Sequence, residues 1–147
     1  MNENIVAVAS DHAGFAMKSL LTDELRRLGF QVLDLGTGSE ESVDYPDFGR
    51  ALAESIADGR APRGVVVCGT GIGISIAANR NPAVRAALCR DTTAARLSRE
   101  HNDANVLALG ARLTGDEVAL DCLRVFLATP FAGGRHQRRV DKLGAGA

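Results

Sequence analysis

A chain of 147 residues, of which 46% are hydrophobic and 24% charged, is typical of one globular domain with a sizeable core. The formal net charge of −1 does not favour nucleic acid or a membrane surface as a partner, and no apolar run is long enough to cross a bilayer. The first residues, Met1-Asn2-Glu3-Asn4, contain no basic or apolar leader, and three widely spaced cysteines do not suggest disulfides. We therefore expect a cytoplasmic protein.

The first part of the chain is predicted to form two strand–helix units. An apolar strand over residues 5–10 ends at Asp11-His12-Ala13-Gly14 and leads into a helix that stops at Gly29. A second strand is expected over residues 30–35. After a polar loop, a helix is expected over residues 46–58, because proline fits the first turn of a helix.

The middle of the chain contains a Gly-rich turn between a strand and a helix. The β-branched run Val65-Val66-Val67 indicates a buried parallel strand that ends in Cys68. The turn Gly69-Thr70-Gly71-Ile72-Gly73 follows and opens an apolar helix. Such a turn leaves backbone N–H groups unpaired at the positive end of a helix dipole, so we expect it to bind an anion. Beside it, Cys68 is a candidate nucleophile or general base, and simple core packing is the alternative.

The last part of the chain continues the alternation of strands and helices. The expected elements are, in order, a strand over residues 85–89, a helix from about 91 to 100, a strand over 105–109, a helix over 114–127 and a basic helical piece from about 133. Asp91 is expected to cap the first of these helices. His101-Asn102-Asp103 is expected in the loop that follows it, and the chain ends in a Gly/Ala tail.

Strands and helices alternate five times without a repeat or a linker, so residues 1–147 are predicted to form one α/β domain. This pattern indicates a parallel sheet with helices on both faces, a three-layer arrangement. Ligands of such sheets bind at the carboxyl ends of the strands. The polar side chains expected at that edge belong to Asp11, His12, Cys68, Asp91 and Arg112. We predict that the functional site lies there.

Two known phosphate-binding motifs do not match the Gly-rich turn. A P-loop requires a lysine, and none occurs over residues 65–80. The dinucleotide fingerprint requires a third glycine where Ile74 stands, although Asp91 occupies the approximate place of its ribose-binding acid. A nucleotide-binding module therefore stays open as an alternative. Cys89 and Cys122 are expected to pack in the core.

The histidines and the carboxyl-terminal arginines give less specific signals. His12, His101 and His136 show no recognisable metal-ligand spacing. Arg135 and Arg139 are four residues apart, so they share one face of a helix. Their forked donors suit a phosphate group, and a solvated basic face is the alternative.

Together, these motifs resemble the RpiB/LacAB family of sugar-phosphate isomerases over nearly the whole chain. The matching stretches are Ser10-Asp11-His12-Ala13-Gly14, Asp44-Tyr45-Pro46, and residues 68–79, 97–107 and 133–140. The resemblance implies a Rossmann-like five-stranded sheet of order 2-1-3-5-4. It also implies a homodimer or tetramer with sites between subunits, and the basic helix from about residue 133 at the interface. The implied reaction is aldose–ketose isomerisation of a small sugar phosphate without a metal or an organic cofactor.

The resemblance also implies roles for individual residues. Cys68 would move a proton between C1 and C2, and Gly69, Gly71, Ile72 and Gly73 would supply N–H donors. Opening of the sugar ring would involve Thr70, His101 and Asp11. Hydroxyl and phosphate groups would be held by residues from both subunits, namely His12, Asn102, Arg112, Arg135, Arg139 and, less directly, Tyr45.

The substrate and the catalytic base have alternatives within and outside this family. Some members lack the cysteine and use a glutamate just past the turn, but Asn79-Arg80-Asn81 contains no acid, so the role stays with Cys68. Ribose 5-phosphate is the leading substrate; galactose, allose or erythrulose phosphates are alternatives. A catalytically silent sugar-phosphate sensor is a further one.

Overall fold

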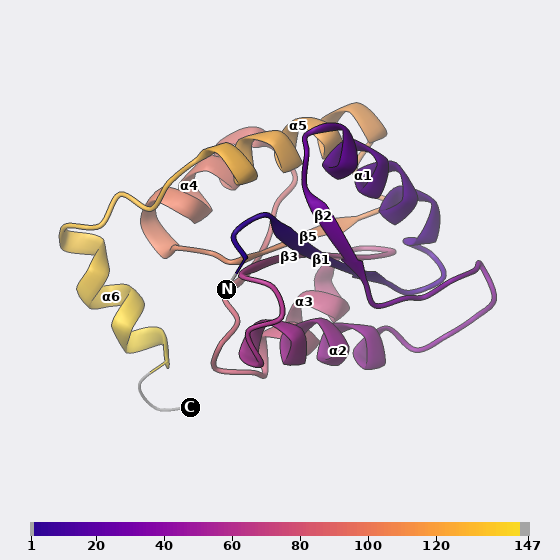
Figure 1. Ribbon diagram of the computed structural model, residues 1–147, viewed down its shortest axis with the longest axis horizontal. Helices are drawn as coiled ribbons and strands as arrows, with labels where there is room; N and C mark the ends of the chain where they lie inside the picture. Colours follow the sequence, from indigo (N-terminus) through magenta and orange to yellow (C-terminus); the bar gives the residue numbers. More distant parts are fainter. Residues whose placement is uncertain (1, 145–147) are drawn as a thin grey trace.

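Five parallel strands form one sheet in the order β2-β1-β3-β5-β4 in the computed structural model, which describes residues 2–144 (Figure 1). The strands are β1 (Ile5–Ser10), β2 (Gln31–Asp34), β3 (Arg63–Cys68), β4 (Ala86–Leu88) and β5 (Val106–Gly110). The helices are α1 (Phe15–Arg27), α2 (Tyr45–Ala57), α3 (Ile72–Asn79), α4 (Thr92–Asn102), α5 (Asp116–Ala128) and α6 (Arg135–Gly144). The predicted fold class and strand order are confirmed.

Helices cover both faces of the sheet and make a three-layer sandwich. Figure 1 shows α1, α4 and α5 on one face and α2 and α3 on the other. Successive strand residues point to opposite faces, so Val65 and Val67 pack in the first layer whereas Val66 and Cys68 pack in the second. Cys68 therefore lies on the α3 side of the sheet, directly before the turn that opens this helix.

The register of the central strands brings their carboxyl ends to a common edge. Cys68 on β3 pairs with Gly110 on β5, and Ser10 on β1 pairs with Val67. The expectation that Asp11, the Gly-rich turn and Arg112 meet at one edge of the sheet is therefore confirmed. At the opposite edge, Gly64 pairs with Val106.

Element boundaries differ from the expectation at several places, and two of them concern candidate residues. Helix α4 extends to Asn102, so His101 and Asn102 lie in its last turn and not in a loop. The helix ends without a glycine, because Asp103 adopts a left-handed conformation (φ 46°) and its carboxylate accepts a hydrogen bond from Arg99 at 2.9 Å. Strand β4 is shorter than expected, so Cys89 follows the strand.

Two helix ends follow the sequence expectation. The Asp91 carboxylate accepts a hydrogen bond from the Ala94 N–H at 2.7 Å and caps α4. Gly29 follows α1 with a positive φ of 93°. Because the Asp91 side chain is engaged by its own helix, the structure gives it a local role that needs no nucleotide.

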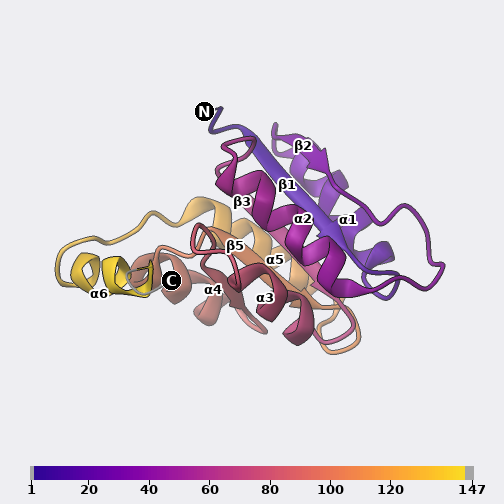
Figure 2. The same cartoon turned by 90° about the horizontal axis from the view of Figure 1, so that it is seen from below.

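Helix α6 stands apart from the sandwich. In Figures 1 and 2 it lies at the far left, and it packs against α4. The His136 ring on α6 stacks on the His101 ring on α4, with 4.4 Å between ring centroids and 17° between planes. The expected helix after the glycine pair is confirmed; the Gly/Ala tail lies outside the described residues. No helix within residues 2–144 has the length and hydropathy needed to span a membrane.

Candidate active site

The turn after β3 holds the sulfur of Cys68 with a main-chain donor. The Gly71 N–H donates to Cys68 Sγ at 3.1 Å, and the Cys68 side chain is only 4% exposed. Gly71 adopts a φ of 78°, and a Cβ atom there would lie 2.8 Å from the Leu109 carbonyl carbon. Only glycine fits this position without strain. The turn therefore places an N–H group and the amino end of α3 at the sulfur, where both stabilise negative charge.

The same turn presents unpaired N–H groups. Within residues 2–144, the main-chain N–H groups of Gly69, Thr70 and Gly73 donate to no protein acceptor. The Thr70 hydroxyl is exposed and accepts a hydrogen bond from the Ile72 N–H at 3.2 Å. Of the four N–H groups expected to face a ligand, those of Gly69 and Gly73 are free, whereas those of Gly71 and Ile72 bond to Cys68 and Thr70. The free donors beside Cys68 make the turn suitable for binding an anion.

Loop 110–112 packs tightly against this turn and brings a cation to it. A Cβ atom on Gly110 would lie 2.4 Å from the Thr70 carbonyl oxygen, so the two loops touch through their main chains. The Arg112 N–H donates to the Gly69 carbonyl at 2.9 Å. The Arg112 guanidinium lies over Gly69, since a Cβ atom there would lie 3.4 Å from Arg112 Nη1. Arg112 therefore adds positive charge next to the free N–H groups.

Asp11 closes the turn between β1 and α1. Its N–H donates to the Val67 carbonyl at 3.2 Å, and its Oδ1 accepts from the Gly14 N–H at 3.1 Å. Helix α1 begins after Gly14, so Asp11 orders the approach to the helix and does not cap it. A Cβ atom on Gly14 would lie 2.6 Å from the Val67 carbonyl oxygen. The absence of a side chain at Gly14 therefore allows this turn to pack closely against β3. The buried Asp11 carboxyl is thereby fixed at the same edge as Cys68.

His12 is held in one tautomer by the loop before α2. Its Nδ1 lies 3.1 Å from the Val43 N–H. Because a backbone N–H can only donate, Nδ1 is the acceptor and the ring proton of neutral His12 is on Nε2. The free edge of His12 therefore offers an N–H donor.

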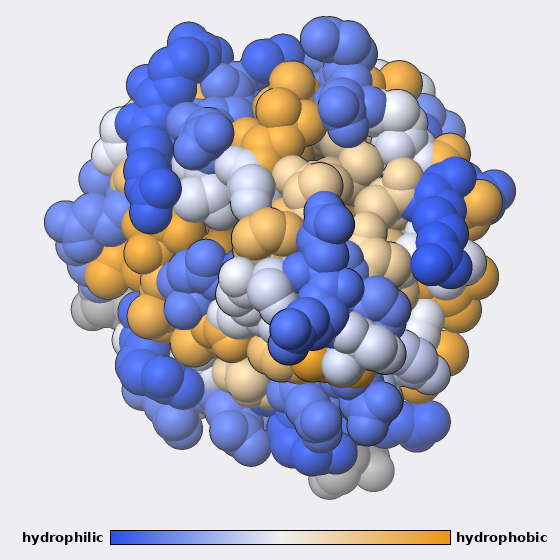
Figure 3. Space-filling view, turned by 90° about the vertical axis from the view of Figure 1, so that its right-hand side faces the viewer, coloured by the Kyte–Doolittle hydropathy of each residue, from blue (hydrophilic) through white to orange (hydrophobic). Residues whose placement is uncertain are grey.

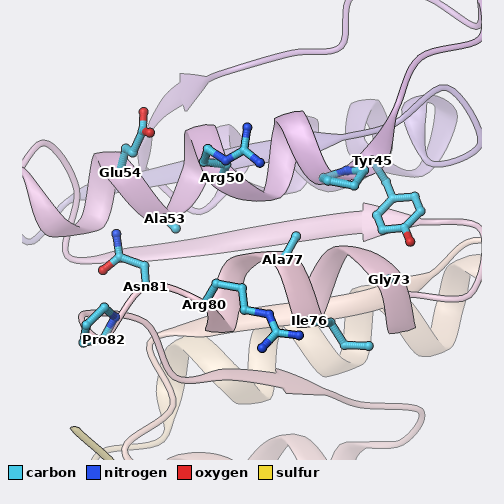
Figure 4. A pocket seen from close by; sticks show the side chains of 11 residues that line it. Tyr45, Arg50, Ala53, Glu54, Gly73, Ile76, Ala77, Arg80, Asn81 and Pro82 are labelled. Atoms are coloured by element: carbon cyan, nitrogen blue, oxygen red, sulfur yellow. The ribbon is translucent and has the colours of Figure 1, made fainter. Parts of the chain in front are cut away.

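Tyr45 covers the Gly-rich turn from the side of α2. A Cβ atom on Gly73 would lie 2.4 Å from Tyr45 Cε1, so the ring rests on this glycine. Figure 4 shows Tyr45 and Gly73 at one end of a groove of about 530 Å³ between α2 and α3, with Arg50 and Arg80 along it. Figure 3 views the molecule from the side of the carboxyl edge, where hydrophobic residues gather centrally between hydrophilic ones.

The other candidate residues lie at the opposite edge of the sheet. Helix α4 begins at the carboxyl end of β4 and returns the chain to the amino end of β5, so its last residues lie at the amino edge. There, an open pocket of about 260 Å³ lies between α4 and α6. It is lined by His101, Asn102, His136, Arg139, Val140 and Leu143. One chain does not bring His101, Asn102, Arg135 and Arg139 to Cys68.

His136 also belongs to this group at the amino edge, although the sequence did not indicate it as a site residue. Desolvation first, and then the neighbouring His101, Arg135 and Arg139, lower the pKa of His136. A neutral His136 ring stacks on His101 without charge repulsion. His136 and Arg139 are three residues apart and therefore share one face of α6. This spacing could have indicated from the sequence that His136 lies beside the candidate arginine.

The other two thiols are buried in the core, and the three histidines do not lie together. Burial raises the pKa of Cys89 to about 11 and also raises the pKa of Cys122. Both thiols are buried in the core, as a packing role requires. His12 lies at the carboxyl edge, away from the stacked pair at the amino edge. Among residues 2–144, no cluster of three or more His, Cys, Asp or Glu side chains is placed to hold a metal ion.

Comparison with known proteins places this geometry among sugar-phosphate enzymes. A sequence model described as Ribose/Galactose Isomerase matches residues 6–143. Ribose-5-phosphate isomerase B of Escherichia coli is 43% identical over 140 residues, which are 95% of this chain and 94% of that protein. D-erythrulose-4-phosphate isomerase of Pectobacterium atrosepticum is 41% identical over 142 residues, 95% of this chain and 92% of that protein. The solved structure of Clostridium thermocellum ribose-5-phosphate isomerase B has a TM-score of 0.95 and 51% identity, covering 96% of this chain and 95% of that one.

Proposed function

We propose that this chain, which belongs to the ribose/galactose isomerase family and is a sugar-phosphate isomerase, interconverts D-ribose 5-phosphate and D-ribulose 5-phosphate. The Escherichia coli relative and the Clostridium thermocellum structure, both named for ribose 5-phosphate, support this substrate. The Pectobacterium relative is almost as similar and is named for D-erythrulose 4-phosphate, so that four-carbon sugar is the second candidate.

The observation that carries the proposal is the sulfur of Cys68 beside the free N–H groups of the Gly-rich turn. Aldose–ketose isomerisation needs one base that takes a proton from one carbon and returns it to the next. The Cys68 thiolate takes the C2 proton of the aldose, and the resulting enediolate carries negative charge on its oxygens. The N–H groups of Gly69, Thr70 and Gly73 stabilise that charge, and the thiol returns the proton to C1. The hydroxyl proton on O2 passes to O1 in the enediolate, so the product is a neutral ketose and no proton is gained or lost.

Polar groups at the same edge serve ring opening and binding. We assign ring opening to the Thr70 hydroxyl and the Asp11 carboxyl, which lie on neighbouring turns of the carboxyl edge. The Nε2–H of His12 and the guanidinium of Arg112 are donors for hydroxyl or phosphate oxygens. Tyr45 forms one wall beside Gly73.

A second copy of the chain is proposed to complete each site. The amino edge of one chain carries His101, Asn102, Arg135 and Arg139, which the carboxyl edge lacks. A two-fold arrangement of antiparallel chains places one edge against the other and forms two equivalent sites. His101 then takes part in ring opening, and Asn102 with the two arginines holds the far end of the sugar phosphate.

Exposed apolar side chains support this homodimer. Ile72 and Ile76 on α3 are 49% and 51% exposed, and Leu143 on α6 is 61% exposed. Ile72 and Ile76 are one helical turn apart on α3, and such adjacent exposed aliphatic side chains are candidates for burial by a partner. Because α6 stands off the sandwich, it is available to pack on a second copy. We infer that α6 lies at the subunit interface.

The test is solvent-deuterium exchange at C2, followed by NMR, on aldose phosphates of four, five and six carbons. We expect exchange together with ketose formation for ribose 5-phosphate. Faster exchange with the four-carbon substrate would reassign the substrate within the same chemistry. No exchange with any of them, from a folded sample, would overturn the isomerase proposal and favour a silent sensor or a nucleotide-binding module. Thermal stabilisation by sugar phosphates or by NAD and ATP separates these two.

A further inference from the structure

A buried lysine lies close to the candidate site but is no part of it. Lys18 on α1 is only 3% exposed, although an ammonium group loses strong hydration when it is buried. Its Nζ donates to Asp34 Oδ1 at 2.6 Å and to the Thr37 carbonyl at 2.8 Å, and it lies 5.7 Å from the centre of the Phe15 ring. Both acceptors belong to residues 34–44, which link β2 to α2 and which we call the strap.

The anchored end of the strap is bonded to the end of β1. The Ser10 N–H donates to the Gly36 carbonyl at 2.8 Å, and the Thr37 N–H donates to the Ser10 carbonyl at 2.8 Å. Asp34 Oδ1, which Lys18 contacts, also accepts from the Gly36 N–H at 2.9 Å. Lys18 is therefore two hydrogen bonds away from the residue that directly precedes Asp11.

The far end of the strap contacts His12. The Val43 N–H donates to His12 Nδ1, and Tyr45 begins α2 two residues later. Figure 1 shows the strap as the long purple loop at the right, where the strands end. Between Gly38 and Ser42 the strap is exposed, so its position is set by the bonds at its two ends.

We propose that Lys18 is a positioning residue for His12. By fixing the Gly36–Thr37 turn against Ser10, it holds the end of β1 and the strap together. It thereby keeps the Val43 N–H on His12 Nδ1 and the Nε2–H directed outward. Lys18 does not touch the substrate, and only the effect on substrate affinity rests on the proposed function.

If Lys18 only stabilised the fold, its replacement would lower the melting temperature without changing KM. Glu24 provides a matched control for that case. Glu24 lies on the same helix, is 6% exposed and is paired with Arg27 and Arg124. It lies toward the amino edge, because α1 runs back from the carboxyl edge. Glu24→Gln therefore removes a buried charge of α1 without touching the strap.

The kinetic test combines Lys18→Met with His12→Ala in a double-mutant cycle. We expect Lys18→Met to raise KM about tenfold, with kcat changed much less, because one charged hydrogen bond to the substrate is weakened. In the His12→Ala background the same change should have no further effect on KM. Glu24→Gln should lower the melting temperature and leave KM unchanged. Independent effects of the two changes on KM, or an unchanged KM in folded Lys18→Met, would overturn the proposal.

A second readout does not depend on catalysis. The chain has three histidines, so ¹⁵N NMR of the ligand-free protein can be assigned to His12 through His12→Ala. We expect one Nε2–H tautomer in the unsubstituted protein and a mixture of tautomers in Lys18→Met. An unchanged His12 signal would overturn the inference even if the enzyme is active, and a changed signal would support it even if no sugar phosphate reacts. Should Lys18→Met fail to fold, Asp34→Asn tests the same anchor, with a smaller change expected in the same direction.

Discussion

The two edges of the sheet carry candidate residues of different kinds. At the carboxyl edge, main-chain atoms make most of the site: the Gly71 N–H holds Cys68, and free N–H groups lie beside it. At the amino edge, the candidate residues are side chains on α4 and α6, and the rings of His101 and His136 stack there. Fixed dipoles are suited to a charge that develops during a reaction, whereas long side chains are suited to binding a charge that is already present. We therefore propose that proton transfer takes place at the carboxyl edge, and that the amino edge adds His101 for ring opening and the arginines for the phosphate group.

The largest effect is expected from removing the sulfur at the carboxyl edge. Cys68→Ala should lower kcat by about 10³-fold, because a positioned general base contributes about 10²- to 10⁴-fold. The main-chain donors remain, so the affinity for the sugar phosphate should persist. Turnover and ligand-induced thermal shift measure the two quantities. Cys89→Ala is the matched control, since it removes a core thiol and should leave kcat intact. Near-normal turnover of Cys68→Ala would remove the sulfur from the mechanism.

Mixing two inactive variants tests whether the edges of different chains meet. Cys68→Ala and His101→Asn should each be defective alone. In an equal mixture half of the dimers are mixed and one of their two sites is intact, so about a quarter of normal turnover should return. Mixing Cys68→Ala with Cys68→Ser is the control and should restore nothing. If the first mixture also stays inactive after subunits have exchanged, the two edges do not share a site.

A smaller effect is expected from shortening one arginine at the amino edge. Arg139→Ala should raise KM about tenfold with little change in kcat, because it removes charged hydrogen bonds to a phosphate group. Arg138→Ala, which changes a neighbouring exposed arginine of α6, is the control. Steady-state kinetics over a range of substrate concentrations separate the two constants. Equal behaviour of the two variants would mean that the phosphate is bound elsewhere.

No kinetic effect is expected from changing Glu24, which pairs with Arg27 and Arg124 and belongs to neither edge's candidate site. Hydrogen bonds from Arg27, followed by those from Arg124, lower the pKa of Glu24 to about 2. Since the folded pKa lies below the unfolded value, the carboxylate stabilises the fold above about pH 4.5, and this contribution disappears as the pH falls toward about 2. Glu24→Gln should therefore flatten the acid side of the stability curve. Acid unfolding followed by circular dichroism measures this, and an unchanged curve would contradict the assignment.

The sequence predicted the carboxyl edge better than the amino edge. The glycine spacing around Cys68 follows from local backbone geometry, which a pattern of residues reveals directly. The helix cap at Asp91 and the helix end at Gly29 also depend only on residues that are neighbours in the sequence, so they could be predicted. His101 was expected in a loop, because the helix was predicted to end at about Glu100. The left-handed Asp103 that ends α4 depends on a contact with Arg99, which the sequence pattern does not show.

Contacts between distant segments could not be predicted in this way. Lys18 occupies a helix position that looks solvated in the sequence, and its burial depends on a strap about twenty residues further along the chain. The stack of His101 on His136 depends on how α6 returns to α4, and no periodicity encodes that approach. Homodimerisation and the pairing of the two edges stay predictions that the mixing experiment tests.

The donor that holds Cys68 has a consequence for how this enzyme can change during evolution. It is a main-chain N–H, so substitutions of the side chains around the turn do not delete it. The exposed side chain of Ile72 can vary while the sulfur keeps its hydrogen bond. The glycine that supplies the N–H, Gly71, is constrained by its positive φ and by the nearby main chain of Leu109. A change at such an exposed position can therefore alter the contact with the sugar while the hydrogen bond to the sulfur is kept.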